Sequence, residues 1–393
     1  MLKHLFRLIW NKKKQNFLLM LEIFVAFIGL FAGFTFILYP YNNYKLPAGL
    51  ETENVWAVNF SKATDIKNLD SLQMFRESVK KSIMSMNGVE DVTFSSVNFP
   101  FSGNGFNAAI KYNGAETWAN FYTVEDNYAK ILGMKMLEGR WFSGDDKVAK
   151  DKPAVITEKL KKEMFGEGDA VGKMVEAEAS GERLKIVGVM ADFKDESDNE
   201  VPRATLLRRM DTADMRHAYS ILLKVKPGAD AALESRMHKM LSNTMKNSEV
   251  EIEHLTDIRA ARNKAMRVPF MIFVIIAGFL IINVALGIFG VLWYNINKRK
   301  GEIGLRRAVG ASGKAISWQL VAEAILLTTL SLILGFFFAV QFPLLKVFAL
   351  PVENYVTAMI YSILFIYALV IVCALYPGKQ AAAIYPAIAL HED

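Results

Sequence analysis

Residues 166–174 have the residue types of a phosphate-binding loop, in which backbone N–H groups cradle phosphates and a hydroxyl contacts magnesium. They read Gly-Glu-Gly-Asp-Ala-Val-Gly-Lys-Met. The glycine spacing is wrong for such a loop, and Met174 stands where a serine or threonine is required. The stretch at 310–314, Gly-Ala-Ser-Gly-Lys, also lacks the spacing. We therefore interpret residues 166–174 as a structural turn.

Residues suited to other catalytic or metal chemistry are dispersed. The single cysteine, Cys373, lies in an apolar run and excludes an intrachain disulfide or a multi-cysteine metal site. The five histidines form no HExxH pattern, and no GxSxG nucleophile motif is present. The acidic side chains between 192 and 200 lack the spacing of a calcium loop, so we expect a solvated loop there. We expect no catalytic residue, metal site or cofactor on this chain.

The composition indicates membrane-spanning segments combined with a water-soluble part. The chain has 393 residues, of which 52% are hydrophobic and 22% charged, and this excludes a disordered or collagen-like protein. A helix needs about 20 mostly apolar residues to cross the hydrocarbon core. Four runs satisfy this requirement, at residues 17–39, 268–294, 316–342 and 356–376.

The distribution of lysine and arginine predicts the orientation of these spans, because positive loops face the cytoplasm. Residues 1–16 and 295–315 are rich in basic side chains, whereas the loop at 343–355 carries one lysine and one glutamate. Both termini, including the tail at 377–393, are then inside, and residues 40–267 are outside. This topology explains the net charge of +6, so the basic charge does not indicate nucleic-acid binding.

The external segment at 40–267 alternates between strand and helix patterns. Strand-like runs include residues 55–60, 89–99, 154–156, 183–190, 220–225 and 250–252; helix-like runs include 69–86, 126–132, 158–165 and 231–245. This predicts an α+β domain inserted between the first and second of four transmembrane helices. Residues 115–195 are expected to form a lobe of their own, and Thr157 is expected to cap the following helix.

A long helix is expected to leave this domain and become the second span. Residues 256–296 would form one helix of roughly 60 Å at 1.5 Å per residue, twice what the hydrocarbon core requires. The outer half would be a rigid stalk that carries Arg262 and Lys264. Pro269 is expected to kink it near the outer membrane surface, and Pro40 to end the first span sharply.

Three polar side chains interrupt the spans, and such residues often mark function. Glu22 is expected to extend toward the lysines at 12–14. Glu323 is expected to pair with a neighbouring basic residue or a helix end, or to contribute to a subunit contact. Asn283 lies mid-span and is expected to hydrogen-bond to another helix.

The loop between spans two and three predicts a short amphipathic helix closed by Gly310, with Ser312 capping the next helix. Ile303, Leu305 and Val309 would form an apolar side; Arg306 and Arg307 would form a basic rim. Two interpretations stay open from the residues alone. The helix lies on anionic lipid, or it docks on a partner protein.

The sequence of this loop resembles the signature of the FtsX/MacB-like ABC transporter permeases. Residues 302–311 read Glu-Ile-Gly-Leu-Arg-Arg-Ala-Val-Gly-Ala. Similar family motifs follow at 319–324 and at the C-terminal end from Tyr376-Pro377 onward. The external segment resembles the MacB periplasmic core domain through short motifs in the same order, at 122–124, 132–133, 138–140, 165–166, 171–173 and 187–189.

The resemblance implies a permease that dimerises, as a homodimer or a heterodimer, and is driven by a separate ABC ATPase that binds ATP. It implies that the loop helix couples to this ATPase through Glu302, Ile303, Gly304, Leu305, Arg306, Arg307 and Gly310. Because only 16 residues precede the first span, we expect the ATPase on another chain. The expected location is the bacterial inner membrane, in contact with lipid, with the large domain in the periplasm.

Two other classes of protein compete with this interpretation. A membrane receptor would bind a ligand with its external domain, but the cytoplasmic segments are too short for an output domain. A membrane-anchored external enzyme would require a catalytic constellation that the sequence lacks. Relatives of the resembled family act on peptides, toxins, lipoproteins or cell-wall hydrolases, some with an adaptor or outer-membrane partner. The resemblance therefore leaves cargo, envelope partner and transport direction open.

Overall fold

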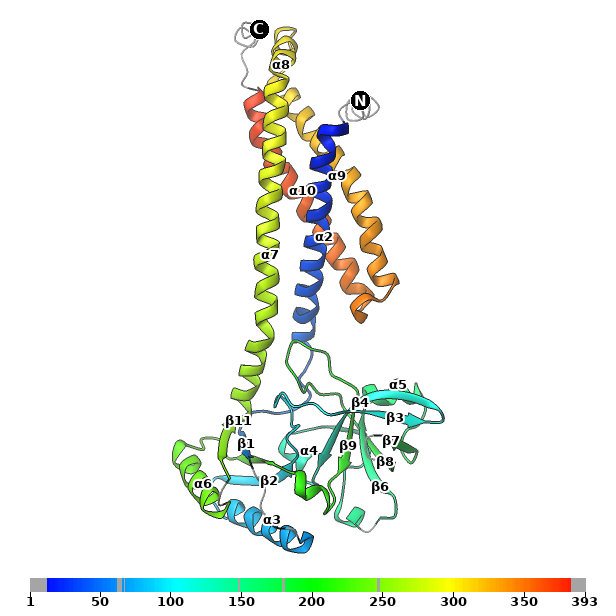
Figure 1. Ribbon diagram of the computed structural model, residues 1–393, viewed down its shortest axis with the longest axis vertical. Helices are drawn as coiled ribbons and strands as arrows, with labels where there is room; N and C mark the ends of the chain where they lie inside the picture. The colour runs from blue at the N-terminus through cyan, green and yellow to red at the C-terminus, as the bar shows by residue number, and fades with distance from the viewer. Residues whose placement is uncertain are drawn as a thin grey trace. The chain divides into compact units, whose positions relative to one another are not determined.

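A computed structural model describes residues 13–61, 66, 68–147, 149–178, 181–245 and 248–382 (Figure 1). The chain divides into two compact units. One contains the chain up to Asn42 together with the chain from Arg267 onward, and the other contains residues 43–266. Each unit is described separately below. Residues 1–12 and 383–393, which include most of the basic N-terminal segment and the end of the tail, lie outside the described residues.

The first unit is helical. Its elements are α2 (Lys13–Tyr44), the membrane part of α7 (Leu255–Lys298), α8 (Lys300–Ala308), α9 (Gly313–Leu344), the short 3₁₀ turn η3 (Val347–Ala349) and α10 (Val352–Ala382). Within the described residues, α2, α7, α9 and α10 are the helices long and apolar enough to cross a membrane. The four predicted hydrophobic runs therefore all lie on helices.

The proline expectations need one correction. α2 continues through Pro40 to Tyr44, so Pro40 does not end the first helix sharply. A proline removes one backbone hydrogen bond, and the residues that follow it can still bond along the helix. α7 likewise continues through Pro269 as one element, so the expected kink at that position stays a prediction.

The core of the helical unit forms where α2 meets its neighbours. Leu19, Ile23, Phe27 and Phe31 of α2 are fully buried. Close approach depends on glycine, because a Cβ on Gly335 of α9 would lie 2.5 Å from the Phe27 ring. On the α7 side, a Cβ on Gly29 would lie 2.5 Å from Leu280.

The second unit is built on one mixed sheet. Its strands are β1 (Val55–Phe60), β2 (Val89–Ser95), β3 (Asn107–Tyr112), β4 (Ala115–Val124), β5 (Met136–Gly139), β6 (Lys152–Thr157), β7 (Met174–Ala177), β8 (Glu182–Met190), β9 (Thr205–Arg209), β10 (Ser220–Val225) and β11 (Val250–His254). Their order is β11-β1-β10-β2-β4-β3-β7-β8-β6-β9, with β5 beside β8. The α+β domain between the first and second long helices is therefore confirmed.

The sheet has two differently built halves. Strands β11, β1, β10 and β2 are antiparallel, and their apolar side packs with α3 (Leu69–Met84) and α6 (Ala231–Thr244) around Ile83, Met237 and Leu241 (Figure 1). In the other half β4 also pairs with β9 in parallel, which closes β4-β3-β7-β8-β6-β9 into a ring. The ring encloses its own apolar cluster, which includes Ile110, Ile156 and Leu206.

The expected lobe at 115–195 differs from this ring in two ways. The ring strands extend from Asn107 to Arg209, and they belong to the same sheet and the same compact unit as the rest of residues 43–266. An apolar cluster that contains Val55, Tyr128 and Leu207 joins residues of both halves. The lobe is therefore not a separate unit, because its apolar surface is shared with the neighbouring strands.

Local signals in the sequence explain the two covering helices. Asn68 caps α3 by accepting from the Ser71 N–H over 3.0 Å, and Asp230 caps α6 by accepting from the Leu233 N–H over 3.0 Å. Thr157 does occupy the N-cap position of α5 (Glu158–Phe165), but its hydroxyl does not cap the helix. The hydroxyl instead accepts from the Thr205 N–H over 3.0 Å, because β9 runs beside it.

The glycine-rich stretch at 166–174 is a pair of turns, as predicted. Gly166 and Gly172 have positive φ angles of 59° and 86°, which favour glycine. The Gly172 N–H donates to the Ile186 carbonyl over 2.7 Å, which ties the turn to β8. The stretch therefore forms part of the ring rather than a phosphate site.

Candidate functional site

The short helix α8 follows directly from the end of α7. Arg299 separates the two helices and occupies the N-cap position of α8. Gly310 ends the segment with a φ of +99°, a conformation that favours glycine. Ser312 then accepts from the Ala315 N–H over 3.2 Å and so caps α9, as predicted. The expected helix and its two boundaries are thus present.

The apolar side of α8 differs from the expectation. Ile303 is 5% exposed and packs in a small cluster with Ile296, Ile316 and Leu320, and Gly304 beside it is also buried. Leu305 is 56% exposed and Val309 is 83% exposed. The three predicted apolar residues therefore do not share one face. Ile303 faces α7 and α9, whereas Leu305 and Val309 face away from them.

The outward face of α8 contains Gly301, Glu302, Leu305, Ala308 and Val309, all exposed. We call these five residues the α8 outward face. Their spacing places them along one side of a helix. The face is a small apolar patch with a carboxylate at its N-terminal end.

A chain of polar contacts fastens α8 to α9. Arg306 donates to the Gln319 amide oxygen over 2.8 Å and also pairs with Glu302 over 2.5 Å. Gln319 in turn donates to Glu323 over 3.2 Å. Arg307 lies half-buried, and its guanidinium reaches the Ala311 carbonyl at 3.5 Å. The predicted basic rim is therefore mostly occupied in holding α8 in place.

Glu323 has the basic partner that was expected. Its carboxylate accepts from the Arg299 guanidinium over 2.9 Å, and both side chains are largely buried. Since Arg299 lies at the α7–α8 junction, this pair holds the end of α7 against α9. Together with the Arg306 contacts it fixes the orientation of three consecutive helices.

Glu22 and Asn283 are the other two polar residues in the spans, and the expectation for Glu22 stays a prediction. Glu22 turns toward α7, where a Cβ on Gly287 would lie 2.1 Å from its Oε2 atom; that oxygen has no hydrogen-bond partner among the described residues. The lysines at 12–14 provide no described side chain to compare. Asn283 is exposed and donates to the Phe279 carbonyl of its own helix over 2.8 Å, and among the described residues no hydrogen bond joins it to another helix.

The outer end of α7 carries the residues predicted for the stalk. Lys264 and Pro269 are exposed. Arg262 is not simply a stalk residue, because its guanidinium pairs with Glu196 in the loop that connects β8 and β9. The sequence predicted the same stalk role for Arg262 and Lys264. In the structure Arg262 forms an ion pair with the β8–β9 loop, whereas Lys264 is exposed.

The acidic loop at 191–204 is not solvated as expected. Asp195 and Asp198 are buried, and so is Lys194. Asp195 accepts from Tyr122 over 2.9 Å and from Arg203, while Asp198 accepts from Arg259. The carboxylates are buried because each has a partner, and buried charges require one. Sequence reasoning missed both arginines: Arg203 lies within this loop, whereas Arg259 is 61 positions from Asp198 in the sequence.

Burial shifts the pKa of three other groups of this loop. Burial raises the pKa of Asp192, although its carboxylate accepts from the Lys159 N–H over 2.8 Å. Burial also raises the pKa of Glu200, and the nearby Glu196 adds to that effect. The Lys194 ammonium has a lowered pKa because burial disfavours its charge. It donates to the carbonyls of Asn43, Leu46 and Asp198 over 2.7, 2.8 and 2.9 Å.

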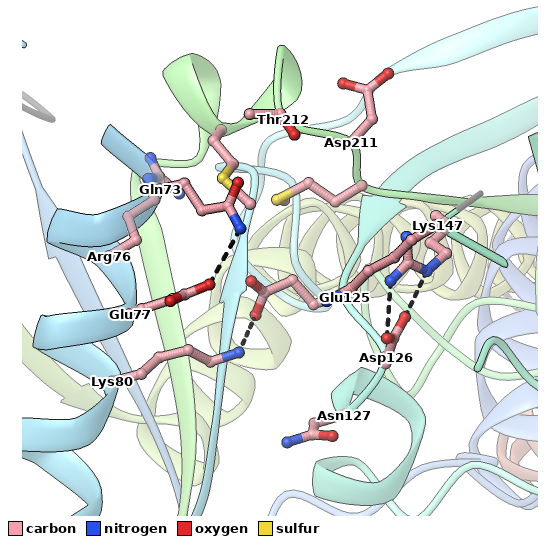
Figure 2. A pocket seen from close by; sticks show the side chains of 13 residues that line it. Gln73, Arg76, Glu77, Lys80, Glu125, Asp126, Asn127, Lys147, Asp211 and Thr212 are labelled. Atoms are coloured by element: carbon pink, nitrogen blue, oxygen red, sulfur yellow. Dashed lines mark hydrogen bonds and ion pairs between the residues drawn. The ribbon is translucent and has the colours of Figure 1, made fainter. Parts of the chain in front are cut away.

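The α+β unit also has a polar cavity of about 350 Å³ between α3 and the end of β9 (Figure 2). Its charged side chains pair across the walls: Lys80 with Glu125 over 2.8 Å, and Arg209 with Asp126 over 2.7 Å. Its lining residues include no serine, cysteine or histidine. Among the described residues, no group of three or more histidine, cysteine or acidic side chains could hold a metal ion.

Two family models match the chain. The MacB-like periplasmic core domain matches residues 25–239, more than half of the chain, and the FtsX-like permease C-terminal domain matches residues 274–386. The chain belongs to the FtsX/MacB-like ABC transporter permeases. The second match contains α8 and α9, and the first contains the ring and most of the sheet. This member of the family is a multi-pass membrane protein with an extracytoplasmic domain.

Individual relatives cover the chain to different extents. The macrolide export ATP-binding/permease protein MacB of Bdellovibrio bacteriovorus is 27% identical over 323 residues, which is 78% of this chain and 48% of that protein. The uncharacterised ABC transporter permease YknZ of Bacillus subtilis is 23% identical over 268 residues, which is 66% of this chain and 64% of that protein. The chain spans about half the length of the MacB relatives it matches.

Among solved structures, the periplasmic region of MacB from Actinobacillus actinomycetemcomitans aligns with this chain. It aligns with a TM-score of 0.39 at 17% identity, and covers 54% of this chain and 94% of that chain.

Proposed function

We propose that this permease works with an ATP-hydrolysing subunit on a separate chain, and that the α8 outward face docks on that subunit. One observation carries the proposal. Leu305 and Val309 point away from the helices that hold α8 in place, and two arginine contacts fix that orientation. An exposed apolar patch beside charged groups is what a docking interface requires. ATP would bind the partner subunit, with no cofactor on this chain.

The same arrangement supports transmission of movement to the extracytoplasmic domain. α8 is tied to the end of α7, and α7 is one helix of 44 residues, roughly 66 Å long at 1.5 Å per residue. We propose that α7 carries a displacement of α8 to its other end. In this proposal ATP-driven movement of the partner reaches the external domain without any substrate passing between the spans.

A second permease chain fits the exposed side of α7. Only 11% of the most apolar window of α7 is buried within the chain, against 44% for α9. Asn283 lies on this exposed surface in the middle of the span, where lipid cannot hydrogen-bond to it. We propose that another permease copy covers this side of α7. Lipid would cover the remaining exposed apolar surface of the helices.

The proposed setting is the bacterial inner membrane with both chain ends in the cytoplasm and residues 43–266 in the periplasm. The support is the excess of basic residues in the α7–α9 connection, where Lys298, Arg299 and Lys300 lie at the junction of α7 and α8. This orientation places α8 on the same side as cellular ATP.

The test is co-purification of the full-length protein from native membranes, with wild type compared with Leu305→Asp. Wild type should recover an ATPase subunit. The variant would bury an unpaired carboxylate at the contact, and a cost of about 2.8 kcal/mol lowers affinity roughly a hundredfold. Lys314→Asp is the matched control, because it adds a carboxylate at an exposed position in the first turn of α9, outside the α8 outward face.

The two interpretations of α8 predict different results in this experiment. If α8 docks on the ATPase, Leu305→Asp loses the ATPase and Lys314→Asp keeps it. If α8 only lies on lipid, both variants recover the ATPase equally in detergent. A wild-type protein that recovers no ATPase under any condition would return the chain to the receptor alternative.

A further inference from the structure

One loop of the α+β unit contacts both segments of chain that connect this unit to the membrane helices. The loop is residues 191–204, between β8 and β9. The incoming segment is residues 43–52, which follows α2, and the outgoing segment is the first turns of α7. All of these residues belong to the second compact unit.

The outgoing helix is held through Asp198. The Arg259 guanidinium donates to both carboxylate oxygens, with Nη2 at 2.7 Å from Oδ1 and Nε at 3.1 Å from Oδ2. One turn later, Asn263 donates to Oδ2 over 2.6 Å, and its own amide oxygen accepts from the Asp198 N–H over 2.9 Å. Asp198 is buried, so these contacts are shielded from water and salt.

The incoming segment is held through Lys194, which is 2% exposed. Its three donors reach the carbonyls of Asn43, Leu46 and Asp198. A buried ammonium uses all three of its hydrogens in this way. Lys194 also donates to the Asp198 carbonyl. The incoming segment, held by Lys194, and the outgoing helix, held by Asp198, are therefore joined through one loop. Arg259 adds a direct link, donating to Thr52 of the incoming segment over 3.2 Å.

The loop is in turn fixed to the ring. Asp195 accepts from Tyr122 of β4 over 2.9 Å and pairs with Asn120 of the same strand. Arg203 binds Asp195 over 2.9 Å and Glu196 over 2.9 Å, and Glu196 pairs with Arg262 of α7. The contacts thus continue from α7 through the loop to the central strand of the sheet.

We infer that loop 191–204 is the joint through which movement of α7 and α2 reaches the extracytoplasmic sheet, and that Arg259, Asp198, Asn263 and Lys194 are its positioning residues. The inference rests on the proposed function, since it concerns where the transmitted movement enters the domain. Apart from the joint, α7 is connected to the sheet by its chain continuity with β11 and by the packing of Leu255 and Ile258 against an apolar cluster that contains strand residues.

The test measures the coupling of α7 to the sheet by spin-label distances in the full-length protein, together with the co-purified ATPase, in lipid nanodiscs. Labels are placed at Ala265 of α7 and Glu116 of β4 after Cys373→Ala, because both positions are exposed and in the same unit. Arg259→Gln removes the bidentate contact. Lys264→Gln is the matched control, an exposed cation on the same helix.

Wild type and Lys264→Gln should give one narrow distance distribution that shifts when ATP is added. Arg259→Gln should lose the narrow distribution and the ATP-dependent shift, while the ATPase still co-purifies and hydrolyses ATP. Asn263→Ala, a milder change, should broaden the distribution with the sheet intact. If Arg259→Gln does not fold, the distance distribution of Asn263→Ala tests the joint in its place.

The outcomes separate this inference from the proposed function. If wild type shows the shift and both joint variants show it with the same narrow width, the joint is overturned and the proposed function stands. If wild type binds no ATPase and shows no shift, the proposed function fails, and the joint fails as a route of transmission. A folded Asn263→Ala protein that matches wild type in width counts against the joint in either case.

Discussion

The Arg299 guanidinium lies 2.9 Å from the Glu323 carboxylate, and this pair connects the end of α7 to α9. The two residues are 24 positions apart in sequence, on either side of α8. The pair therefore acts as a brace behind the helix that we propose as the docking element. It also gives the intramembrane glutamate a structural role that can be separated from docking.

Removal of one partner of this brace should lower the free energy of unfolding more than removal of both partners. Arg299→Ala or Glu323→Ala alone leaves an unpaired buried charge, a change that costs about 3–5 kcal/mol. The double variant leaves none, so its loss of unfolding free energy should be smaller than the sum of the single losses. Thermal unfolding of the purified full-length protein in detergent measures the cycle. Strictly additive losses would show that the two side chains do not interact.

Gly287 and Gly290 of α7 should respond oppositely to alanine. A Cβ on Gly287 would lie 2.1 Å from Glu22 Oε2, whereas a Cβ on Gly290 meets nothing within 4 Å in this chain. Gly287→Ala should therefore lower the melting temperature, while Gly290→Ala should keep or raise it, since alanine favours helix by about 1 kcal/mol.

Relief of the clash provides the control for this pair. Glu22→Ala removes the carboxylate that faces Gly287, so the double variant Glu22→Ala/Gly287→Ala should recover most of the lost stability. If the Gly287→Ala and Gly290→Ala variants have the same melting temperature, the packing of α2 against α7 is looser than the structure shows. A loss with Gly290→Ala alone would instead indicate a partner chain at that position.

Acid should weaken one ion pair of the external domain. Bidentate hydrogen bonds from Arg140, 2.7 Å each, hold the pKa of the Asp146 carboxyl below its usual range. A lowered pKa in the folded state gives stability that is present above about pH 3.9 and is lost as the pH falls through the folded pKa.

The matched variant for this prediction is Arg140→Gln. Its melting temperature should lie below that of wild type at neutral pH, and the difference should shrink as the pH falls below about 4. Lys111→Gln, which breaks the exposed pair with Glu178, should change the melting temperature little at any pH. A constant difference between Arg140→Gln and wild type down to pH 2 would contradict the role of Asp146.

Labelling in intact cells checks the orientation of the chain. In a Cys373→Ala background, a cysteine at Lys226 should react with a membrane-impermeant maleimide, and a cysteine at Lys314 should react only after the cells are opened. Both side chains are exposed, so access reports the side of the membrane rather than burial. The reverse pattern would place α8 outside the cytoplasm and remove the basis for ATPase docking.

Several elements follow from the sequence because their signals are local. The spans at 268–294 and 316–342 lie within single helices, since a run of apolar residues needs no tertiary information to be recognised. The starts of α6 and α9 are set by caps at Asp230 and Ser312. The motif at 302–311 likewise indicated the family, which the FtsX-like match then confirmed.

The ring was not predictable in the same way. β4 reads Ala-Glu-Thr-Trp-Ala-Asn-Phe-Tyr-Thr-Val, a mixed pattern with no clear alternation, because it pairs with β3 on one side and with β9 on the other. β9 was missed as well; its residues Thr205–Arg209 are mostly buried although two of the five are arginine. Such strands are recognised only when their partners are known.

The sequence by itself determined that this is a four-helix membrane permease with an α+β domain, because hydrophobic runs, caps and a family motif are properties of neighbouring residues. Only the tertiary structure decided that Ile303 faces inward while Leu305 faces outward, and that Asp198 is buried against Arg259. The direction of a side chain and the partner of a charge depend on segments far apart in the chain. The acidic cluster was predicted to be solvated because the arginines that pair with it cannot be identified before the fold is known.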